Sequence, residues 1–286
     1  MIIAIYGLGL IGGSLGRAII KKTSHKVLGF DIDKATMLKA NMLNAYHEEI
    51  NDNNIKNADL VVLALTPAVA IKTMREVAPM LKDNAIVIDC CGNKRKIVEE
   101  MDALLEKYPK LNFSGVHPMA GREFSGISHS TAGLFEHAFV IMTPVHTPID
   151  ALVKVKQLFL ELGCEGIEIS TAIHHDEMIA YTSQLAHIVS SSFVKSSHSA
   201  EHVGFSAGSF KDMTRVAKLN PDMWTELLMD NRDNLLREIE ELQKHIEEFK
   251  TALSDKDENK LNELLSEGAI MKEIAENARK ERKRDE

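Results

Sequence analysis

The sequence predicts an α/β protein in which a doubly wound, mostly parallel sheet precedes an all-α region. Short apolar runs alternate with amphipathic segments over the first 170 residues. This alternation is typical of buried parallel strands that are connected by helices. After Ser170 the β pattern stops and helical spacing takes over. We therefore expect two domains, over residues 1–170 and 171–286.

Each expected element has its own apolar pattern. The strands are Ile2–Tyr6, Lys26–Asp31, Leu60–Leu65, Ala85–Asp89, Asn112–Val116, Ala138–Thr143 and Gly166–Ile169. The helices between most of them are Leu10–Lys22, Lys34–Leu43, Ala68–Leu81, Lys94–Lys107 and Ile149–Leu162. In the second domain a helical pattern covers Thr171–Phe193, and Leu235–Phe249 repeats apolar residues at the spacing of an amphipathic helix.

Composition and charge exclude several classes of protein. The 286 residues include 34 basic and 42 acidic side chains, a formal net charge of −8, and 44% are hydrophobic. These are globular proportions, and the acidic balance argues against general binding to nucleic acid or to a membrane surface. No apolar stretch is long enough to cross a membrane, and the start lacks a signal-peptide pattern. The three cysteines are expected to be reduced thiols in a cytoplasmic protein.

A glycine-rich motif, Gly7-Leu8-Gly9-Leu10-Ile11-Gly12, lies between the first expected strand and the first expected helix. In this context it is typical of a Rossmann-type dinucleotide site. The first glycine permits a tight turn, the second lets the backbone approach a pyrophosphate, and the third lets helix and strand pack closely. Asp31 ends the next strand, where a carboxylate accepts from ribose hydroxyls and repels a 2′-phosphate. We expect NAD as the cofactor, with Thr66 and Asn93 as further contacts.

His117 is the candidate catalytic residue. It directly follows the expected strand Asn112–Val116, and the carboxyl ends of parallel strands line the crevice where such folds bind ligands. Imidazole titrates near neutral pH, so His117 can take a proton from a hydroxyl group as hydride leaves the same carbon. The alternative is a structural histidine that caps a turn.

Three segments of the chain resemble the prephenate dehydrogenase family, which includes arogenate dehydrogenases. The first is His117-Pro118-Met119-Ala120-Gly121-x-Glu123-x-Ser125-Gly126. The second is Asp176-x-x-x-Ala180-x-x-Ser183-x-Leu185-x-His187. The third is Gly208-x-x-x-Asp212-x-Thr214-Arg215-x-Ala217, followed by Trp224. With the glycine-rich motif they span about residues 1–235, and their order and spacing make the resemblance specific.

The second segment also forms a pattern of its own. Asp176, Ala180, Ser183 and His187 are spaced so that, at about 100° per residue, they fall on one narrow stripe of a helix. A polar stripe bounded by apolar residues predicts the lining of a cleft, with Asp176, Ser183 and His187 as substrate contacts. The alternative is a buried hydrogen-bond network without a ligand. No metal site is expected from His174, His175 and Asp176, because adjacent histidines diverge on a helix.

The resemblance implies that Arg215 holds the ring carboxylate of prephenate, since arginine binds a carboxylate through two hydrogen bonds. Lys211, one helical turn earlier, and His187 are candidates for the pyruvyl carboxylate or for positioning, and Gly208 belongs to the same site. Trp224 is expected to cover the pocket, within one subunit or across an interface. Without the resemblance, Arg215 is better explained by a surface ion pair with Asp212 or Asp222, and Trp224 fits a core position equally well.

One segment departs from the family pattern. The family commonly has Asp-x-Gly-Ser-x-Lys after the strand that corresponds to Ala85–Asp89, and this chain has Asp89-Cys90-Cys91-Gly92-Asn93-Lys94. Gly92 replaces the serine that usually hydrogen-bonds the reacting hydroxyl. Asn93 or a water molecule is the candidate substitute.

The resemblance implies an NAD-dependent prephenate dehydrogenase, which converts prephenate to 4-hydroxyphenylpyruvate and CO2 in tyrosine biosynthesis. The alternatives are an arogenate dehydrogenase and a nucleotide-binding regulator that has lost catalysis. Helical domains of the family usually pair, and the apolar face of Leu235–Phe249 favours a homodimer. The length leaves no room for a regulatory domain of the ACT type, so tyrosine is expected to inhibit, if at all, at the active site.

Overall fold

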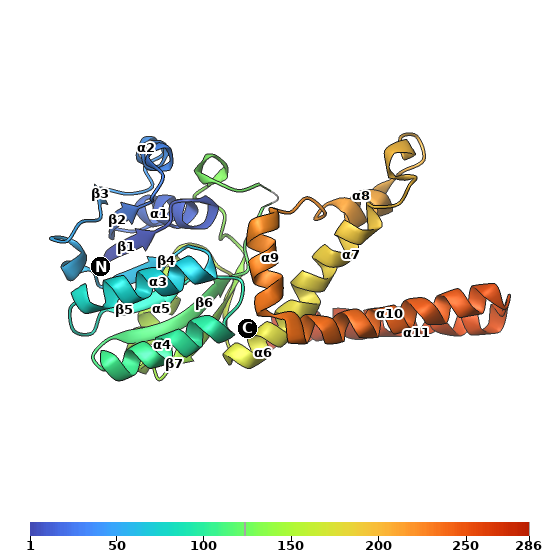
Figure 1. The fold of residues 1–286 in the computed structure, drawn as a ribbon. Coiled ribbons are helices and arrows are strands. Elements are labelled where there is room, and N and C mark those ends of the chain that lie inside the picture. The colour runs from blue at the N-terminus through green and yellow to red at the C-terminus, as the bar shows by residue number, and fades with distance from the viewer. Residues whose placement is uncertain (123, 286) are drawn as a thin grey trace. The chain divides into compact units, whose positions relative to one another are not determined.

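A computed structural model describes residues 1–122 and 124–285, so Glu123 of the first family-like segment lies outside the described residues. The chain divides into two compact units, Met1–Asn234 and Leu235–Glu286. The first unit contains an eight-stranded sheet and the helices that follow it in the chain as far as α9 (Pro221–Asp230) (Figure 1). The second contains most of α10 (Arg232–Ser254) and all of the described part of α11 (Glu258–Asp285).

The sheet has the strand order β3-β2-β1-β4-β5-β6-β7-β8. The strands are β1 (Ile2–Tyr6), β2 (Lys26–Phe30), β3 (Glu48–Glu49), β4 (Leu60–Leu63), β5 (Ile86–Asp89), β6 (Asn112–Pro118), β7 (Phe139–Val145) and β8 (Gly166–Ile169). All neighbours are parallel except β6 and β7, so the predicted mostly parallel sheet is confirmed. The pattern missed only β3, whose two exposed glutamates carry no apolar signal.

Helices cover both faces of the sheet. One core cluster joins the sheet to α1 (Leu10–Lys22), α2 (Lys34–Met42) and α5 (Ile149–Glu161), and the other joins it to α3 (Pro67–Val77) and α4 (Arg95–Lys107). The chain winds outward in one direction from β1 and in the other from β4. In doubly wound folds the ligand crevice opens where this direction reverses, beyond the carboxyl ends of the strands.

The helical region that follows β8 begins with α6 (Ala172–Ile179) and α7 (Ala186–Phe193), which are joined by a π-helical segment, Ala180–Leu185. A π-helix closes its hydrogen bonds over five residues instead of four, so 100° per residue does not apply across it. The single stripe that we predicted from Asp176 to His187 is therefore interrupted. The region continues with α8 (Gly208–Thr214) and α9.

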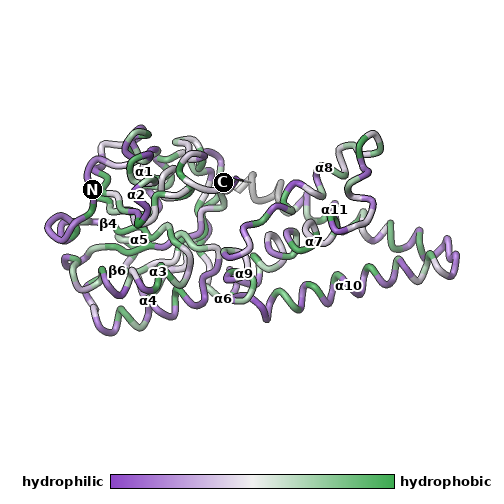
Figure 2. The backbone as a smooth tube through the Cα atoms, turned by 45° about the horizontal axis from the view of Figure 1, so that its top comes forward, coloured by the Kyte–Doolittle hydropathy of each residue, from purple (hydrophilic) through white to green (hydrophobic). Residues whose placement is uncertain are grey.

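The second unit is a pair of helices, and Figure 2 shows hydrophobic and hydrophilic residues alternating along α10, as predicted for an amphipathic helix. Within the described residues, no helix combines the length and the apolar character that crossing a membrane requires. All three cysteines are free thiols, and burial raises the pKa of Cys164 to about 11.

Candidate active site

The glycine-rich turn between β1 and α1 has the geometry that a dinucleotide requires. Gly7 has φ +85°, and a Cβ there would lie 2.4 Å from the carbonyl oxygen of Ala64. A Cβ at Gly12 would lie 1.9 Å from the carbonyl oxygen of Gly7, so helix and turn pack too closely for a side chain. A Cβ at Gly9 would meet nothing within 4 Å. The space in front of Gly9 and the first turn of α1 is thus open for a phosphate group.

The residues between these glycines support the turn. Leu8 is fully buried in the core, and Leu10 and Ile11 are half-buried at the start of α1. Asp31 follows β2, and its Oδ2 accepts a hydrogen bond of 2.8 Å from the backbone N–H of Leu8. Its Oδ1 accepts from the N–H of Asp33 at 3.0 Å. The carboxylate is therefore fixed beside the turn, and each oxygen has a lone pair left for a ribose hydroxyl.

His117 lies near the end of β6 and contacts a second histidine. Its Nδ1 is 2.9 Å from Nε2 of His175, which lies on α6. The Nδ1 of His175 is in turn 2.7 Å from Oδ1 of Asp176. His117 is half-buried, whereas the side chains of His175 and Asp176 are 0% and 1% exposed. The carboxylate of Asp176 also accepts from the N–H groups of Lys94 at 2.7 Å and Arg95 at 3.0 Å, at the start of α4.

The electrostatic surroundings keep both histidines neutral. Burial lowers the pKa of His117 well below its usual value, and the nearby positive charge of Lys94 lowers it further. Burial also lowers the pKa of His175, and the hydrogen bond to Asp176 opposes this only in part. For Asp176, burial would raise the pKa, but hydrogen bonds from His175 and from the Arg95 and Lys94 backbone lower it overall. At neutral pH the group is thus imidazole, imidazole and carboxylate.

A buried ion pair lies beside these groups. The Nζ of Lys94 donates to Oδ2 of Asp89, and both side chains are 0% exposed. Asp89 also accepts from the N–H groups of Cys91 at 2.7 Å and Val116 at 3.1 Å. We call His117, His175, Asp176, Lys94 and Asp89 the His117 cluster. The contacts of His175, Lys94 and Asp89 were not predicted from the sequence. The signal for the pair was an Asp at a strand end with a Lys five residues later.

Asn93 and Gly92 lie next to this cluster and contact α9. The Nδ2 of Asn93 donates to the carbonyl oxygen of Leu227 at 2.7 Å, and its Oδ1 accepts from Nε2 of Gln184 at 2.8 Å. A Cβ at Gly92 would lie 3.4 Å from a methyl group of Leu227. The Asn93 amide is therefore used within the protein at both ends. Its predicted contact with the cofactor or with the hydroxyl group stays a prediction.

Thr66 follows β4 and precedes the first turn of α3, as a cofactor contact at a strand end should. A carboxylate from α9 reaches the same turn, because Glu226 Oε1 accepts from the N–H of Ala68 at 2.7 Å. Further along the chain, Asn231 donates from Nδ2 to the carbonyl oxygen of Asp176 at 2.7 Å. Helix α9 and the residue that follows it are thus hydrogen-bonded to the first turn of α3 and to α6.

The predicted substrate residues form a second group around His187. Its Nδ1 is 3.0 Å from the carbonyl oxygen of Val216, and its ring centroid is 4.1 Å from that of Trp224. Burial lowers the pKa of His187, and the positive charge of Arg215 lowers it further. Arg215 is therefore close enough to His187 to interact with it electrostatically. Arg215, Lys211 and Gly208 are exposed, and Ser183 is half-buried in the π-helical segment.

The structure brings Asp176 and His187 to different neighbours, although we predicted one stripe. Asp176 belongs to the buried network at the start of α4, which is the alternative that the sequence left open, and His187 contacts Val216 and Trp224. The reason is the π-helical segment between them. Asp176 therefore reaches His117 only through His175.

A glycine-rich turn, a fixed carboxylate at the next strand end and a neutral histidine at a nearby strand end define the class of this protein: a dehydrogenase that uses a dinucleotide. Profiles of two known domains match the chain. "Prephenate dehydrogenase, nucleotide-binding domain" matches residues 15–168, and "Prephenate dehydrogenase, dimerization domain" matches residues 171–267. The chain belongs to the prephenate dehydrogenase family. At the level of the family this confirms the predicted NAD-dependent oxidoreductase.

Three relatives illustrate the similarity. The prephenate dehydrogenase of Bacillus subtilis is 31% identical over 269 residues, which cover 91% of this chain and 72% of that protein. The crystal structure of Synechocystis arogenate dehydrogenase has a TM-score of 0.80 at 25% identity and covers 96% of this chain and 100% of that chain. The structure of A. aeolicus prephenate dehydrogenase with hydroxyphenyl propionate and NAD+ has a TM-score of 0.79 at 28% identity and covers 96% and 98%. Because the named substrates differ, the family alone does not choose between them.

Proposed function

We propose that this protein is an NAD-dependent prephenate dehydrogenase, which converts prephenate to 4-hydroxyphenylpyruvate and CO2 in tyrosine biosynthesis. The observation that carries the proposal is the half-buried, neutral imidazole of His117 at a strand end beside a dinucleotide turn. A neutral imidazole is the form that accepts a proton, and general bases of this kind contribute about 10²–10⁴ in rate.

The cofactor site consists of the glycine-rich turn, residues 7–12, with Asp31, Thr66 and Asn93. The open space at Gly9 and the free N–H groups of the first turn of α1 fit a pyrophosphate, and the fixed Asp31 carboxylate fits ribose hydroxyls. Its negative charge favours NAD over NADP, since a 2′-phosphate would be repelled. When bound, the nicotinamide supplies the hydride acceptor.

The protein's own contribution is to move one proton and to orient the substrate. His117 accepts the proton of the C4 hydroxyl as the C4–H bond breaks, and the ring carboxylate leaves as CO2 while the ring becomes aromatic. The proton then returns to the oxygen of the product, so that the histidine is regenerated and no net proton is released.

The substrate carboxylates are assigned to the second group of residues. Arg215 holds the ring carboxylate, and His187, Lys211 and Ser183 bind or position the pyruvyl end, with Gly208 and Trp224 forming the wall. The contact of Trp224 with His187 and the charge of Arg215 close to His187 support this grouping. Asp176 contributes to the site through His175 rather than by touching the substrate.

The family profile for residues 171–267 is that of a dimerization domain, which supports a homodimer. We assign the enzyme to the cytoplasm and tyrosine inhibition to the active site. In the assay described next, tyrosine should then raise the KM for prephenate and leave kcat unchanged. Light scattering at micromolar protein concentration should give the mass of two chains.

The test is a matrix of two cofactors and two substrates, with NADH or NADPH formation as the readout. NAD with prephenate should give the highest kcat/KM, and His117→Gln should lower it by about 10²–10⁴. His174→Gln, an exposed histidine on α6, is the matched control and should leave it unchanged. A higher kcat/KM with arogenate would make this an arogenate dehydrogenase, as in the Synechocystis relative. No activity with any pair would overturn the proposal in favour of a silent regulator.

A further inference from the structure

Three side chains of the His117 cluster form one continuous line of hydrogen bonds. His117 Nδ1 lies 2.9 Å from His175 Nε2, and His175 Nδ1 lies 2.7 Å from Asp176 Oδ1. Each imidazole has two ring nitrogens, and in the neutral form one donates and the other accepts. The proton positions along this line are therefore coupled: fixing one of them fixes the others.

Asp176, at one end of this line, determines which atom of each pair carries the proton. Its carboxylate accepts from two backbone N–H groups, those of Lys94 and Arg95, and from Nε of Arg95 at 3.3 Å. All these partners are donors only, and hydrogen bonds lower the pKa of Asp176, so the carboxylate is ionised and has no proton to give. The proton in the 2.7 Å contact must then lie on Nδ1 of His175.

The order continues to His117. His175 is neutral, because burial and the charge of Lys94 lower its pKa, so its Nε2 has a lone pair and accepts. The proton between the two rings must come from His117, which donates through Nδ1. Since His117 is neutral as well, its Nε2 has no proton and presents a lone pair. This is the tautomer that a base needs.

We infer that His175 and Asp176 are positioning residues that hold His117 as its Nδ1–H tautomer, with Nε2 free to accept the proton of the substrate hydroxyl. The inference rests on the proposed function of His117 as the base. When the substrate O–H bond breaks and the Nε2–H bond forms, the imidazolium of His117 stays bonded to His175, which is bonded to the Asp176 carboxylate. The same line stabilises the charge until the proton returns to the product oxygen.

The groups that face His117 agree with this assignment. His175 comes from α6, and Lys94 reaches from the start of α4 to Asp89 at the end of β5. Lys94 donates only and is paired with Asp89, so it cannot take the proton of His117 Nδ1. Among the described residues around His117, His175 Nε2 is the acceptor within hydrogen-bond distance of Nδ1.

The first test changes the polarity of the line without changing its shape. In Asp176→Asn one oxygen becomes an NH2 donor. The amide has two orientations. With its oxygen toward the N–H and Nε of Arg95, its NH2 group faces only one backbone donor, the N–H of Lys94, instead of two donors of Arg95. In this orientation the NH2 group donates to His175 Nδ1. His175 then donates from Nε2, and His117 becomes the Nε2–H tautomer. In serine proteases the corresponding Asp→Asn change costs about 10⁴ in kcat for this reason. We expect kcat/KM for prephenate to fall by about 10²–10⁴.

The second test observes the tautomer directly. Nitrogen-15 NMR of protein labelled in the histidine rings distinguishes protonated from unprotonated ring nitrogens, and His117→Gln identifies the His117 signals. The wild-type protein should have the His117 proton on Nδ1, and Asp176→Asn should move it to Nε2. His174→Gln, whose side chain is exposed and next to the same residues in sequence, should change neither the tautomer nor kcat/KM.

The outcomes separate this inference from the proposed function. A wild-type proton on Nε2 of His117 would overturn the positioning role even if the enzyme is active. This measurement is made on the wild-type protein, and His117→Gln serves only to identify the signals. Asp176→Asn that keeps the wild-type fold and retains kcat/KM within about threefold would also overturn it. An absence of activity in the wild type with every cofactor and substrate would instead overturn the proposed function, while the tautomer could still be measured.

Discussion

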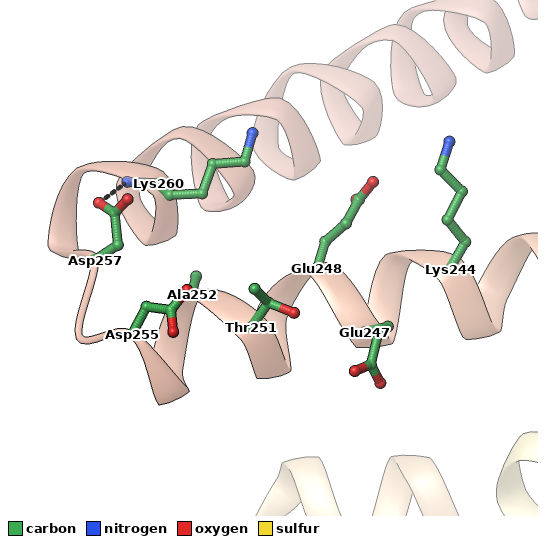
Figure 3. A pocket seen from close by; sticks show the side chains of 8 residues that line it. All are labelled: Lys244, Glu247, Glu248, Thr251, Ala252, Asp255, Asp257 and Lys260. Atoms are coloured by element: carbon green, nitrogen blue, oxygen red, sulfur yellow. Dashed lines mark hydrogen bonds between the residues drawn. The ribbon is translucent and has the colours of Figure 1, made fainter.

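The His117 cluster in the first unit and a pocket on the helical pair of the second unit are both rich in charged residues, yet they differ in burial. The pocket is lined by Lys244, Glu247, Glu248, Thr251, Ala252, Asp255, Asp257 and Lys260 (Figure 3). One of these residues, Glu247, forms an ion pair with Lys250 on the same helix, and both side chains of the pair are mostly exposed. In the His117 cluster the ion pair of Lys94 with Asp89 joins separate elements, and both side chains are fully buried.

This difference in burial determines which charged groups have altered protonation. An exposed pair exchanges water for a partner at almost no net gain. A buried group that loses water must find hydrogen bonds or change its protonation state. For this reason the proposed base is the His117 imidazole, whose pKa burial lowers, and not one of the carboxylates of the pocket in Figure 3.

The largest effect should come from breaking the buried ion pair. Lys94→Met leaves the Asp89 carboxylate buried without its cation, and removing one partner of such a pair costs about 3–5 kcal/mol. Urea unfolding should show this loss in the free energy of unfolding. Adding Asp89→Asn to Lys94→Met should restore part of it, because no uncompensated charge remains. A loss below about 1 kcal/mol would contradict the assignment of a buried pair.

Cofactor choice should respond to the fixed carboxylate of Asp31. In Asp31→Ser the repulsion of a 2′-phosphate disappears along with an acceptor for the ribose hydroxyl. The ratio of kcat/KM for NAD to that for NADP should fall at least about tenfold, or about 1.4 kcal/mol. Asp33→Ser, which keeps an N-cap for α2, is the matched control and should leave the ratio near the wild-type value. An unchanged ratio in Asp31→Ser would show that other groups select the cofactor.

Acid should destabilise the first unit through its two buried histidines. The pKa values of His117 and His175 are lower in the folded protein than the usual 6.5, so below pH 6.5 the unfolded chain binds more protons than the folded one. Stability should therefore fall as pH drops below 6.5, by up to about 1.4 kcal/mol per pH unit for each histidine. Asp176, whose pKa is also lowered in the folded protein, reduces stability in the same way only when the pH falls below 3.8, the usual pKa of an aspartate. Urea unfolding between pH 7.5 and 5 (roughly the window that this linkage defines) should show a smaller slope in His117→Gln.

The smallest effect belongs to the helical pair. Lys250 lies 2.9 Å from Glu247, and the two side chains are 68% and 62% exposed. Lys250→Ala should change the free energy of unfolding by no more than about 0.5 kcal/mol. High salt should leave even less of this difference, because exposed charges are screened. A loss comparable to that of Lys94→Met would remove the contrast between the two regions.

The sequence predicted the features that local patterns determine. The glycines of residues 7–12, Asp31 and His117 all lie at strand ends, and apolar runs mark where strands end. The roles of Gly7 and Gly12 also follow from local geometry, and both positions lack room for a Cβ. Seven of the eight strands were predicted, since each carries a short pattern of apolar residues.

Tertiary contacts explain what the sequence did not predict. His175 is 58 residues away from His117, and no local pattern relates them. It lies on the buried face of α6, four residues before buried Ile179, and nothing in the sequence pattern identifies its partner. The π-helical segment was invisible as well, because its composition does not differ from that of the α-helices on either side. The stripe drawn from Asp176 to His187 failed for that reason.

The π-helical segment Ala180–Leu185 lets one continuous helix direct two groups of side chains toward different neighbours. Deleting a single residue inside it would restore an ordinary α-helix and turn everything beyond it by about 100°. His175 and Asp176 would keep their place, while His187 would lose Val216 and Trp224. The segment thus sets the rotation between the residues to which we assign proton transfer and those to which we assign substrate binding, and one deleted residue would change that rotation.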